Sequence, residues 1–248
     1  MKSCGANKLL YVGICVAVLA GGFAAGVPSQ QKVDEVVADE IVQFEHGEDA
    51  ESAVRVLKAQ GVTDEMLGSA YLKIVRKKMF AVRRSVDAAN LNNAMWGLSQ
   101  YGTENQLTNL LYVAENATDE ITVTSAVFAY HAREGRSPRF LDWAQRILRQ
   151  PNRSRRIKND IWSCLSRDIK AKECSEKCRS RILRMARESL ETDLEGAFYP
   201  DRILAAHDAA YRTGTERRKI AEKVLSKQNL NEVVRRHFGS VTGKDPAK

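Results

Sequence analysis

Helical spacing of apolar residues is the feature that most constrains the fold of this chain. From residue 27 onward, apolar positions return at intervals of three and four, as in the run that follows Thr63. Alternation typical of a strand is confined to 120–127, inside a longer helical pattern. N-cap residues such as Thr103 and the pair Ser137-Pro138 precede the apolar runs. The pattern predicts an all-α protein.

The same signals predict where the helices begin and end. A first apolar face runs from Val33 to Phe44 and is expected to end at Gly47, and a second is expected to end at Gly61. Further helices are expected after Thr63, around 87–102, 103–114, 118–130 and 137–150, with Pro151 ending the last of these. The remaining helices are expected at 155–168, 174–192, 200–212, 216–226 and 229–238.

Glycines recur between the expected helices at related spacings of 41, 33 and 79 residues: Gly61, Gly102, Gly135 and Gly214. A shift of 33 residues also superposes the apolar residues around Gly102 on those around Gly135. We expect each of these glycines to supply the left-handed residue that ends one helix, and a threonine to cap the next. The spacing indicates internal repeats.

One stretch carries a family resemblance. The pattern Ala94-x-x-x-Leu98-x-x-x-Gly102, followed by Leu107 and Leu110-Leu111, resembles the helical hairpin of HEAT-like and armadillo-like α-solenoids. The resemblance covers 50–230 and is best in 87–150, without the regular Asp/Arg pair at the turns and with a drifting unit length. It implies antiparallel hairpins stacked as a short α-solenoid over 27–238, with a flexible tail at 239–248, and a binding scaffold more often than an enzyme. A non-repetitive helical bundle is the alternative.

The N-terminus has the pattern of an export signal. Residues 1–8 contain Lys2 and Lys8 and no acidic residue. An 18-residue apolar run follows from Leu9 to Gly26. Small residues allow cleavage after Gly26 or after Ala24. An uncleaved membrane anchor and a buried helix of a soluble protein are the alternatives to a signal peptide at 1–26. Both membrane interpretations place residues 27–248 outside the cytoplasm, in the periplasm or secreted.

Charge is distributed unevenly along the exported part. Residues 27–132 hold 9 basic and 15 acidic residues, whereas residues 133–187 hold 17 basic and 6 acidic ones. Arginine binds carboxylate, sulfate and phosphate bidentately. We therefore predict an anion-binding surface within 133–187, formed by Arg146, Arg149, Arg153, Arg155, Arg156, Arg179, Arg181 and Arg184. A solvated helix face and docking onto the acidic stretch 34–51 are the alternatives.

Three cysteines lie beyond the export signal, at Cys164, Cys174 and Cys178. In an antiparallel hairpin that turns near residue 171, Cys164 and Cys178 come level with each other. Outside the cytoplasm this predicts a disulfide between them, preferred over Cys164 with Cys174. The four histidines are scattered, so the sequence predicts no metal site and no cofactor.

Catalytic motifs based on nucleophilic serine, on HExxH or on glycine-rich phosphate loops are absent from the sequence, and no catalytic residue is assigned. The leading hypothesis is an exported, non-enzymatic scaffold for protein–protein interaction in the cell envelope. A binder of acidic polysaccharide or of anionic membrane lipid is the first alternative, and a cell-envelope enzyme with unmarked carboxylates is the second. Nucleic acid is an unlikely partner for an exported protein.

Overall fold

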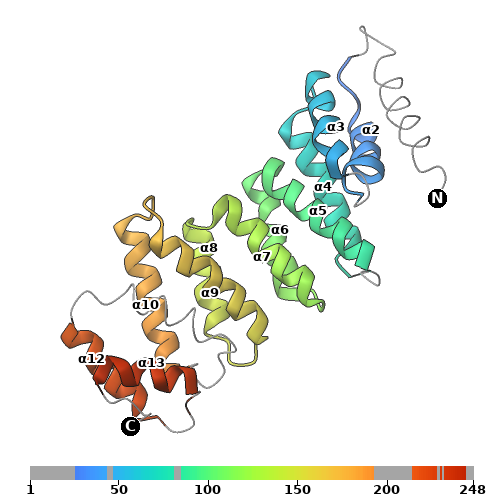
Figure 1. Ribbon diagram of the computed structural model, residues 1–248. Helices are drawn as coiled ribbons and strands as arrows, with labels where there is room; N and C mark the ends of the chain where they lie inside the picture. Colours follow the sequence, from blue (N-terminus) through green and yellow to red (C-terminus); the bar gives the residue numbers. More distant parts are fainter. Residues whose placement is uncertain are drawn as a thin grey trace, which may run out of the picture. The chain divides into compact units, whose positions relative to one another are not determined.

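A computed structural model describes residues 26–43, 47–80, 85–192, 214–227, 230 and 232–243. Every regular element in these ranges is a helix, which confirms the all-α prediction (Figure 1). Residues 1–25 of the expected signal or anchor, and the helix expected at 200–212, lie outside the described residues. The chain divides into two compact units, residues 1–106 and 107–248.

The first unit is built from helices that pack around α4. Helix α2 (Gln30–Val36) continues directly into a π-helix, η1 (Val37–Ile41), and is followed by α3 (Gly47–Ala59), α4 (Asp64–Lys78) and α5 (Ser85–Tyr101). Helix α4 packs against α2, η1 and α5, and α3 packs against η1. The apolar positions that the spacing identified are buried, among them Val33, Leu67, Val75, Leu91 and Met95.

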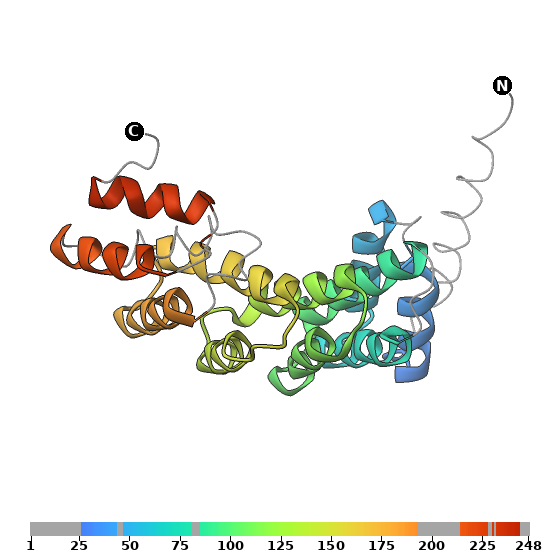
Figure 2. The same ribbon diagram turned by 90° about the horizontal axis from the view of Figure 1, so that it is seen from below.

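The second unit arranges its helices in two layers. Helix α6 (Glu104–Asn116) begins in the first unit and is followed by α7 (Glu120–Glu134), α8 (Pro138–Leu148), α9 (Arg155–Lys170) and α10 (Glu176–Thr192). Helix α7 packs along α9 and α8 packs along α10 (Figure 2). Helix α8 also contacts α7 and α9, and α9 contacts α10. The last pair, α12 (Gly214–Leu225) and α13 (Glu232–Thr242), packs together.

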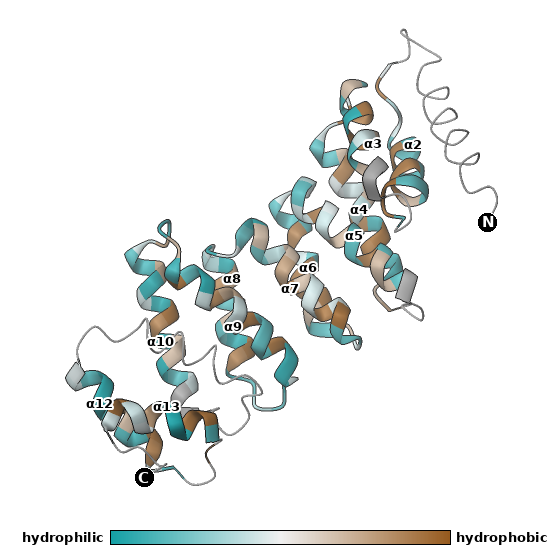
Figure 3. Ribbon diagram, in the orientation of Figure 1, coloured by the Kyte–Doolittle hydropathy of each residue, from teal (hydrophilic) through white to brown (hydrophobic). Residues whose placement is uncertain are grey.

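The helix starts recur at a regular interval. Helices α5, α7 and α9 begin at Ser85, Glu120 and Arg155, which are 35 residues apart both times. Apolar residues gather where neighbouring helices meet (Figure 3), and Phe140 and Ile147 of α8 are fully buried. The second unit is built of packed helix pairs, which is compatible with a helical repeat. In the described part of the chain, none of the helices combines the length and apolarity needed to cross a membrane.

Local capping explains why the helix starts were predictable. The Thr63 hydroxyl accepts a hydrogen bond from the Met66 amide at 3.3 Å, and the Ser137 hydroxyl accepts one from Phe140 at 3.2 Å. At α6, Thr103 and Gln106 form a reciprocal capping box. The Gln106 amide donates to the Thr103 hydroxyl at 3.4 Å, and the Thr103 amide donates to Gln106 Oε1 at 2.8 Å.

The expectation that all four repeated glycines are left-handed is wrong. Among the described glycines, only Gly61 (φ 88°) and Gly243 (φ 73°) have a positive φ. Gly135 caps α7 with a φ of −57°, and a Cβ there would lie 2.2 Å from Cδ2 of His131. Gly214 begins α12. Space beside His131, and not backbone conformation, therefore explains the glycine at 135.

Two expected boundaries also change. Gly47 begins α3 and does not end the preceding helix, which already ends as the π-helix at Ile41. The last helix runs to Thr242, four residues beyond its expected end at 238. Both Phe238 and Thr242 are buried, and the Thr242 hydroxyl donates to the Phe238 carbonyl at 3.2 Å, so this end of the helix packs against the unit.

Candidate functional site

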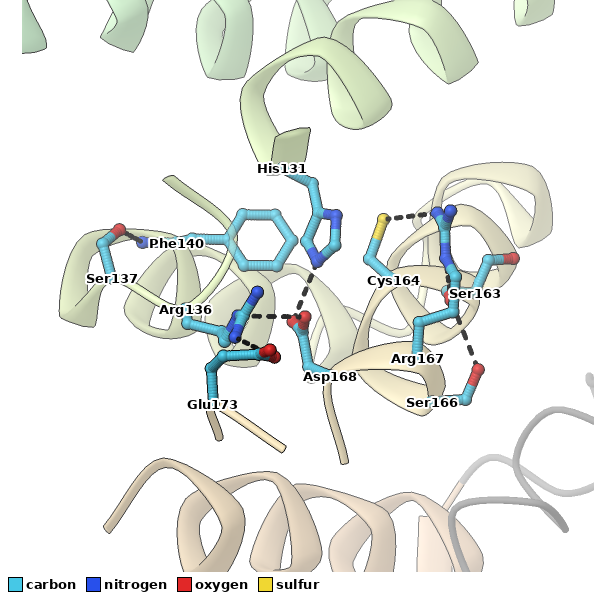
Figure 4. Close-up of polar contacts among 10 residues, drawn as sticks. All are labelled: His131, Arg136, Ser137, Phe140, Ser163, Cys164, Ser166, Arg167, Asp168 and Glu173. Carbon is cyan, nitrogen blue, oxygen red and sulfur yellow. Dashed lines mark hydrogen bonds and ion pairs between the residues drawn. The ribbon is translucent and has the colours of Figure 1, made fainter. Parts of the chain in front are cut away.

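A buried polar contact joins α7 to α9. His131 lies in the last turn of α7, and its Nε2 donates to Oδ2 of Asp168, in the last turn of α9, at 2.8 Å (Figure 4). The Asp168 side chain is 5% exposed and the His131 side chain 13%. A buried carboxylate is costly unless it is paired and hydrogen-bonded, so this contact holds the two helices in one register.

Arg136 extends this group to the links between helices. Its Nε lies 3.7 Å from Oδ1 of Asp168, and one of its terminal nitrogens donates to Glu173 at 3.2 Å. Arg136 belongs to the α7–α8 link and Glu173 to the α9–α10 link. The backbone amide of Glu173 itself, followed by Arg136, holds the pKa of that exposed carboxyl below its usual value. His131, Arg136, Asp168 and Glu173 are called the His131 cluster below.

A thiol lies on the other side of the histidine. In the view of Figure 4, the His131 ring lies between the Asp168 carboxylate and the thiol of Cys164. That thiol accepts a hydrogen bond from Arg167 at 3.9 Å, and the Arg167 guanidinium also lies over the Phe128 ring at 5.3 Å. Cysteine, histidine and aspartate together are the residue types of a nucleophilic triad.

The environment of Cys164 argues against such chemistry. The residue is fully buried, and this burial raises the pKa of its thiol to about 12, with Arg167 acting in the opposite direction. The nucleophile of a cysteine enzyme is the thiolate, which such a pKa makes rare at neutral pH. The arrangement is therefore one of packing, in which a neutral, buried thiol accepts a weak hydrogen bond from Arg167.

A second polar contact lies further along the same two helices. The Thr124 hydroxyl of α7 donates to Oδ2 of Asp160 at 2.7 Å and accepts from Nε of Arg156 at 3.1 Å, both on α9. Arg156 Nε also lies 3.5 Å from the Asp160 carboxylate. Like His131 and Asp168, Thr124 and Asp160 are about one repeat apart, at 36 residues.

Arginines connect α6 and α8 in the other layer. Both terminal nitrogens of Arg146 donate hydrogen bonds to the Glu115 carboxylate, at 3.0 and 2.6 Å. The Trp143 indole donates to the same carboxylate at 2.8 Å. Arg153 donates to the Glu115 backbone carbonyl at 2.8 Å. The hydrogen bonds from Arg146 hold the pKa of the Glu115 carboxyl below its usual value, with burial acting in the opposite direction.

Similar contacts connect α8 and α10. Arg149 donates to both carboxylate oxygens of Glu188 at 2.9–3.1 Å. Arg181 donates to the Asp142 carboxylate and, at 3.3 Å, to the side-chain oxygen of Gln145. The side-chain contacts from α6 to α8 and from α8 to α10 are called the arginine ladder below.

Five of the eight arginines predicted to bind an anion thus contact other parts of the chain, namely Arg146, Arg149, Arg153, Arg156 and Arg181. The side chains of Arg155, Arg179 and Arg184 form no ion pair or hydrogen bond among the residues that the structure describes. Arg155 begins α9 and Arg179 lies in the first turns of α10, at opposite ends of the antiparallel helices. The three do not converge on one point, and their role in binding stays a prediction.

Three lysines that sequence reasoning left out of the site lie beside Arg179. Lys170 ends α9, Lys172 lies in the link and Lys177 in the first turn of α10. All three are exposed and, like Arg179, pair with no other residue in the described ranges. Their density within 133–187 was visible in the sequence, but their freedom from acidic partners was not. Lys170, Lys172, Lys177 and Arg179 are called the basic turn below.

The cysteines are placed as two separate groups. Cys164, Cys174 and Cys178 are buried thiols in the structure. The Cys164 thiol contacts Arg167 on its own helix, whereas Cys178 interacts with Cys174 across the start of α10. The disulfide between Cys164 and Cys178 stays a prediction. Within the described ranges, no three His, Cys, Asp or Glu residues are grouped so as to hold a metal ion.

Comparison with protein-family models, with curated proteins and with solved structures finds no match to this chain.

Proposed function

We propose that the protein is an extracytoplasmic scaffold of the HEAT-like or armadillo-like helical-repeat class, and that it binds an acidic protein partner through the basic turn. One observation carries the proposal. Most arginines of the basic stretch are engaged within the chain, whereas Lys170, Lys172, Lys177 and Arg179, at one link, pair with no residue that the structure describes. Unpaired, exposed cations are the ones available to an incoming anion.

The surrounding contacts support a preorganised binding surface. Glu173, in the same link, is hydrogen-bonded to Arg136 at 3.2 Å, and the Ser175 hydroxyl caps α10 by accepting from the Cys178 amide at 3.2 Å. Hydrogen bonds therefore hold the α9–α10 link at Glu173 and at Ser175 in the free protein. A surface that is ordered in the free protein loses less entropy on binding.

A specific observation also favours the alternative of an acidic polymer or an anionic membrane surface. Within the described part of the chain, Arg155 and Arg184 are also without a partner, and both lie away from the basic turn. A long polyanion or a lipid surface would contact all of these cations together, whereas a protein that docks on the basic turn would not depend on Arg155. The two proposals therefore differ in which arginines and lysines matter.

The proposed binding is tested by photo-crosslinking in the host envelope. A photoreactive residue is placed at position 172 in the otherwise unchanged chain and, as a comparison, at position 219 on α12. Adducts with one acidic protein that form at position 172 and not at 219 are expected. Equal adducts at both positions, or none at 172, would contradict docking on the basic turn.

Charge reversal separates the alternatives. The variant Lys172→Glu/Lys177→Glu is compared with Lys219→Glu/Arg235→Glu, which has the same change in net charge. Lys219 and Arg235 are also exposed and pair with none of the described residues. A protein partner of the basic turn is lost only in the first variant. A polyanion surface predicts that both variants, and Arg155→Glu, elute from heparin at lower salt.

A further inference from the structure

The start of α10 brings two thiols together. The Cys174 amide donates to the Ala171 carbonyl at 3.2 Å, which folds the link back just before the helix. Ser175 is the N-cap, and its hydroxyl accepts the Cys178 amide at 3.2 Å. This capping places Cys174 directly before the cap and Cys178 in the first turn, four residues later. The Cys174 thiol donates to the Ser175 carbonyl at 3.8 Å, and Cys174 is close enough to Cys178 to raise the pKa of its thiol.

Both cysteines are buried, on the two sides of the N-cap Ser175. Cys174 is 6% exposed and Cys178 7%. Cys164, in contrast, directs its sulfur to Arg167, a residue on its own helix, at 3.9 Å. A disulfide requires Cβ atoms that face each other, with Cα atoms within about 7 Å. Cys174 and Cys178 are one helical turn apart, across a single N-cap residue, whereas Cys164 lies on another helix with Arg167 as its partner.

We propose that oxidation joins Cys174 to Cys178 in a disulfide that closes the first turn of α10, in place of the Cys164–Cys178 pairing that the sequence favours. The proposal is independent of the proposed binding function, since it concerns only the link and the helix start. It assigns a modification site directly within the basic turn, between Lys172 and Arg179.

The reaction needs an oxidant that carries a disulfide, such as oxidised glutathione or a thiol oxidoreductase. One cysteine attacks a sulfur of the oxidant as its thiolate, forming a mixed disulfide and releasing one thiol. The other cysteine then attacks the mixed disulfide and releases the second thiol. The two protein thiols lose two protons and two electrons in total. The disulfide of the oxidant takes up these protons and electrons and becomes two thiols.

The local environment sets the pace of this reaction. Burial, followed by the hydrogen bond with Cys174, raises the pKa of the Cys178 thiol to about 12. Few thiolates are present at neutral pH, so uncatalysed exchange is slow and accelerates as the pH rises. Oxidation by a small disulfide at pH 9 is therefore expected to be faster than at pH 7.

Tryptic mapping of the full chain tests the pairing directly. Trypsin cleaves after Lys172, Lys177 and Arg179, and releases Cys174 in 173–177 and Cys178 in 178–179. Cys164 is released in 159–167. After incubation of the native protein with oxidised glutathione, we expect peptide 173–177 linked to 178–179. A link between 159–167 and 178–179, or a link of either cysteine to another part of the chain, would overturn the proposal.

Serine variants provide the control. Cys164→Ser is expected to leave the linked peptide pair unchanged, whereas Cys174→Ser and Cys178→Ser remove it. Circular dichroism of each variant verifies that the helices are intact. If all three thiols of the folded wild-type chain stay reactive after unfolding in a thiol assay, despite the oxidant, the disulfide does not form and the proposal is wrong.

Discussion

Nε2 of His131 lies 2.8 Å from Oδ2 of Asp168, although 37 residues separate them in the sequence. The contact joins the last turns of α7 and α9, at equivalent places in consecutive helix pairs. The Asp168 carboxylate is 5% exposed, so its hydrogen bonds decide whether its burial is tolerated.

Replacing His131 should destabilise the second unit. His131→Ala leaves the Asp168 carboxylate without its shortest partner, and we expect the free energy of unfolding to fall by about 2–3 kcal/mol in urea titrations. Asp168→Asn in the same background should recover part of the loss, because a neutral amide costs less to bury. Arg236→Ala, which breaks an exposed pair with Glu232, should change stability by less than about 0.5 kcal/mol.

Gly135 should not tolerate a side chain. A Cβ at this position would lie 2.2 Å from the His131 ring, so Gly135→Ala is expected to lower stability by about 1–3 kcal/mol. Gly214→Ala is the matched control, because a Cβ there meets no atom within 4 Å. Thermal melts that show equal effects for the two substitutions would contradict the packing described here.

Acid should weaken the arginine ladder through Glu115. Its pKa is held below the ordinary value of 4.5, chiefly by Arg146, so the charged form stabilises the fold. This contribution is complete above the unfolded pKa and is lost as the pH falls through the lower, folded pKa. Glu115→Gln should be less stable at pH 7 by roughly 1 kcal/mol and should lose less stability than the wild type on acidification. Denaturant midpoints from pH 7 to pH 3 measure the difference.

Alkali should destabilise the fold through its thiols. Burial raises the pKa of Cys164 from 9.0 to about 12, so the thiol ionises in the unfolded chain at a lower pH than in the folded one. The stabilisation is complete below pH 9 and is lost as the pH rises toward 12. Cys164→Ser should show a smaller loss of stability between pH 8 and pH 10. In the wild type, iodoacetamide should label Cys164 slowly at pH 8 unless urea is present.

The exposed end of the ladder should contribute little to stability. Arg149 is 62% exposed and Glu188 35%, although their geometry is bidentate. A double-mutant cycle with Arg149→Ala and Glu188→Ala is expected to give a coupling of about 0.5–1 kcal/mol that decreases in 0.5 M salt. A coupling above about 2 kcal/mol would mean that this pair is more strongly desolvated than its exposure indicates.

The helices were predictable because their signals are local. Thr63 and Ser137 cap helices through bonds to residues only three positions away, so the sequence neighbourhood contains both partners. The apolar spacing of α8 and α9 likewise needs only the period of a helix. The end of the first helix was missed because its π-helical turn, Val37–Ile41, has the same apolar periodicity as an ordinary helix over so short a range.

Which arginines are paired was harder to predict, because their acidic partners are distant in the sequence. Asp142, Asp160, Asp168 and Glu173 lie inside the basic stretch, but which cation each one meets depends on how the helices pack. Glu115, which binds Arg146, and Glu188, which binds Arg149, lie outside the stretch altogether. The net charge of 133–187 therefore overstated the number of cations that are free to bind an anion.

The separation of these contacts has a consequence for how the chain acquires its structure. The side-chain links among α6, α7, α8, α9 and α10 span 28–39 residues, which is about one helix pair. Each of these links can therefore form as soon as the next helix pair is present, without the C-terminal helices. Contacts of such short sequence separation favour rapid, stepwise folding, in which each helix pair packs on the pair before it.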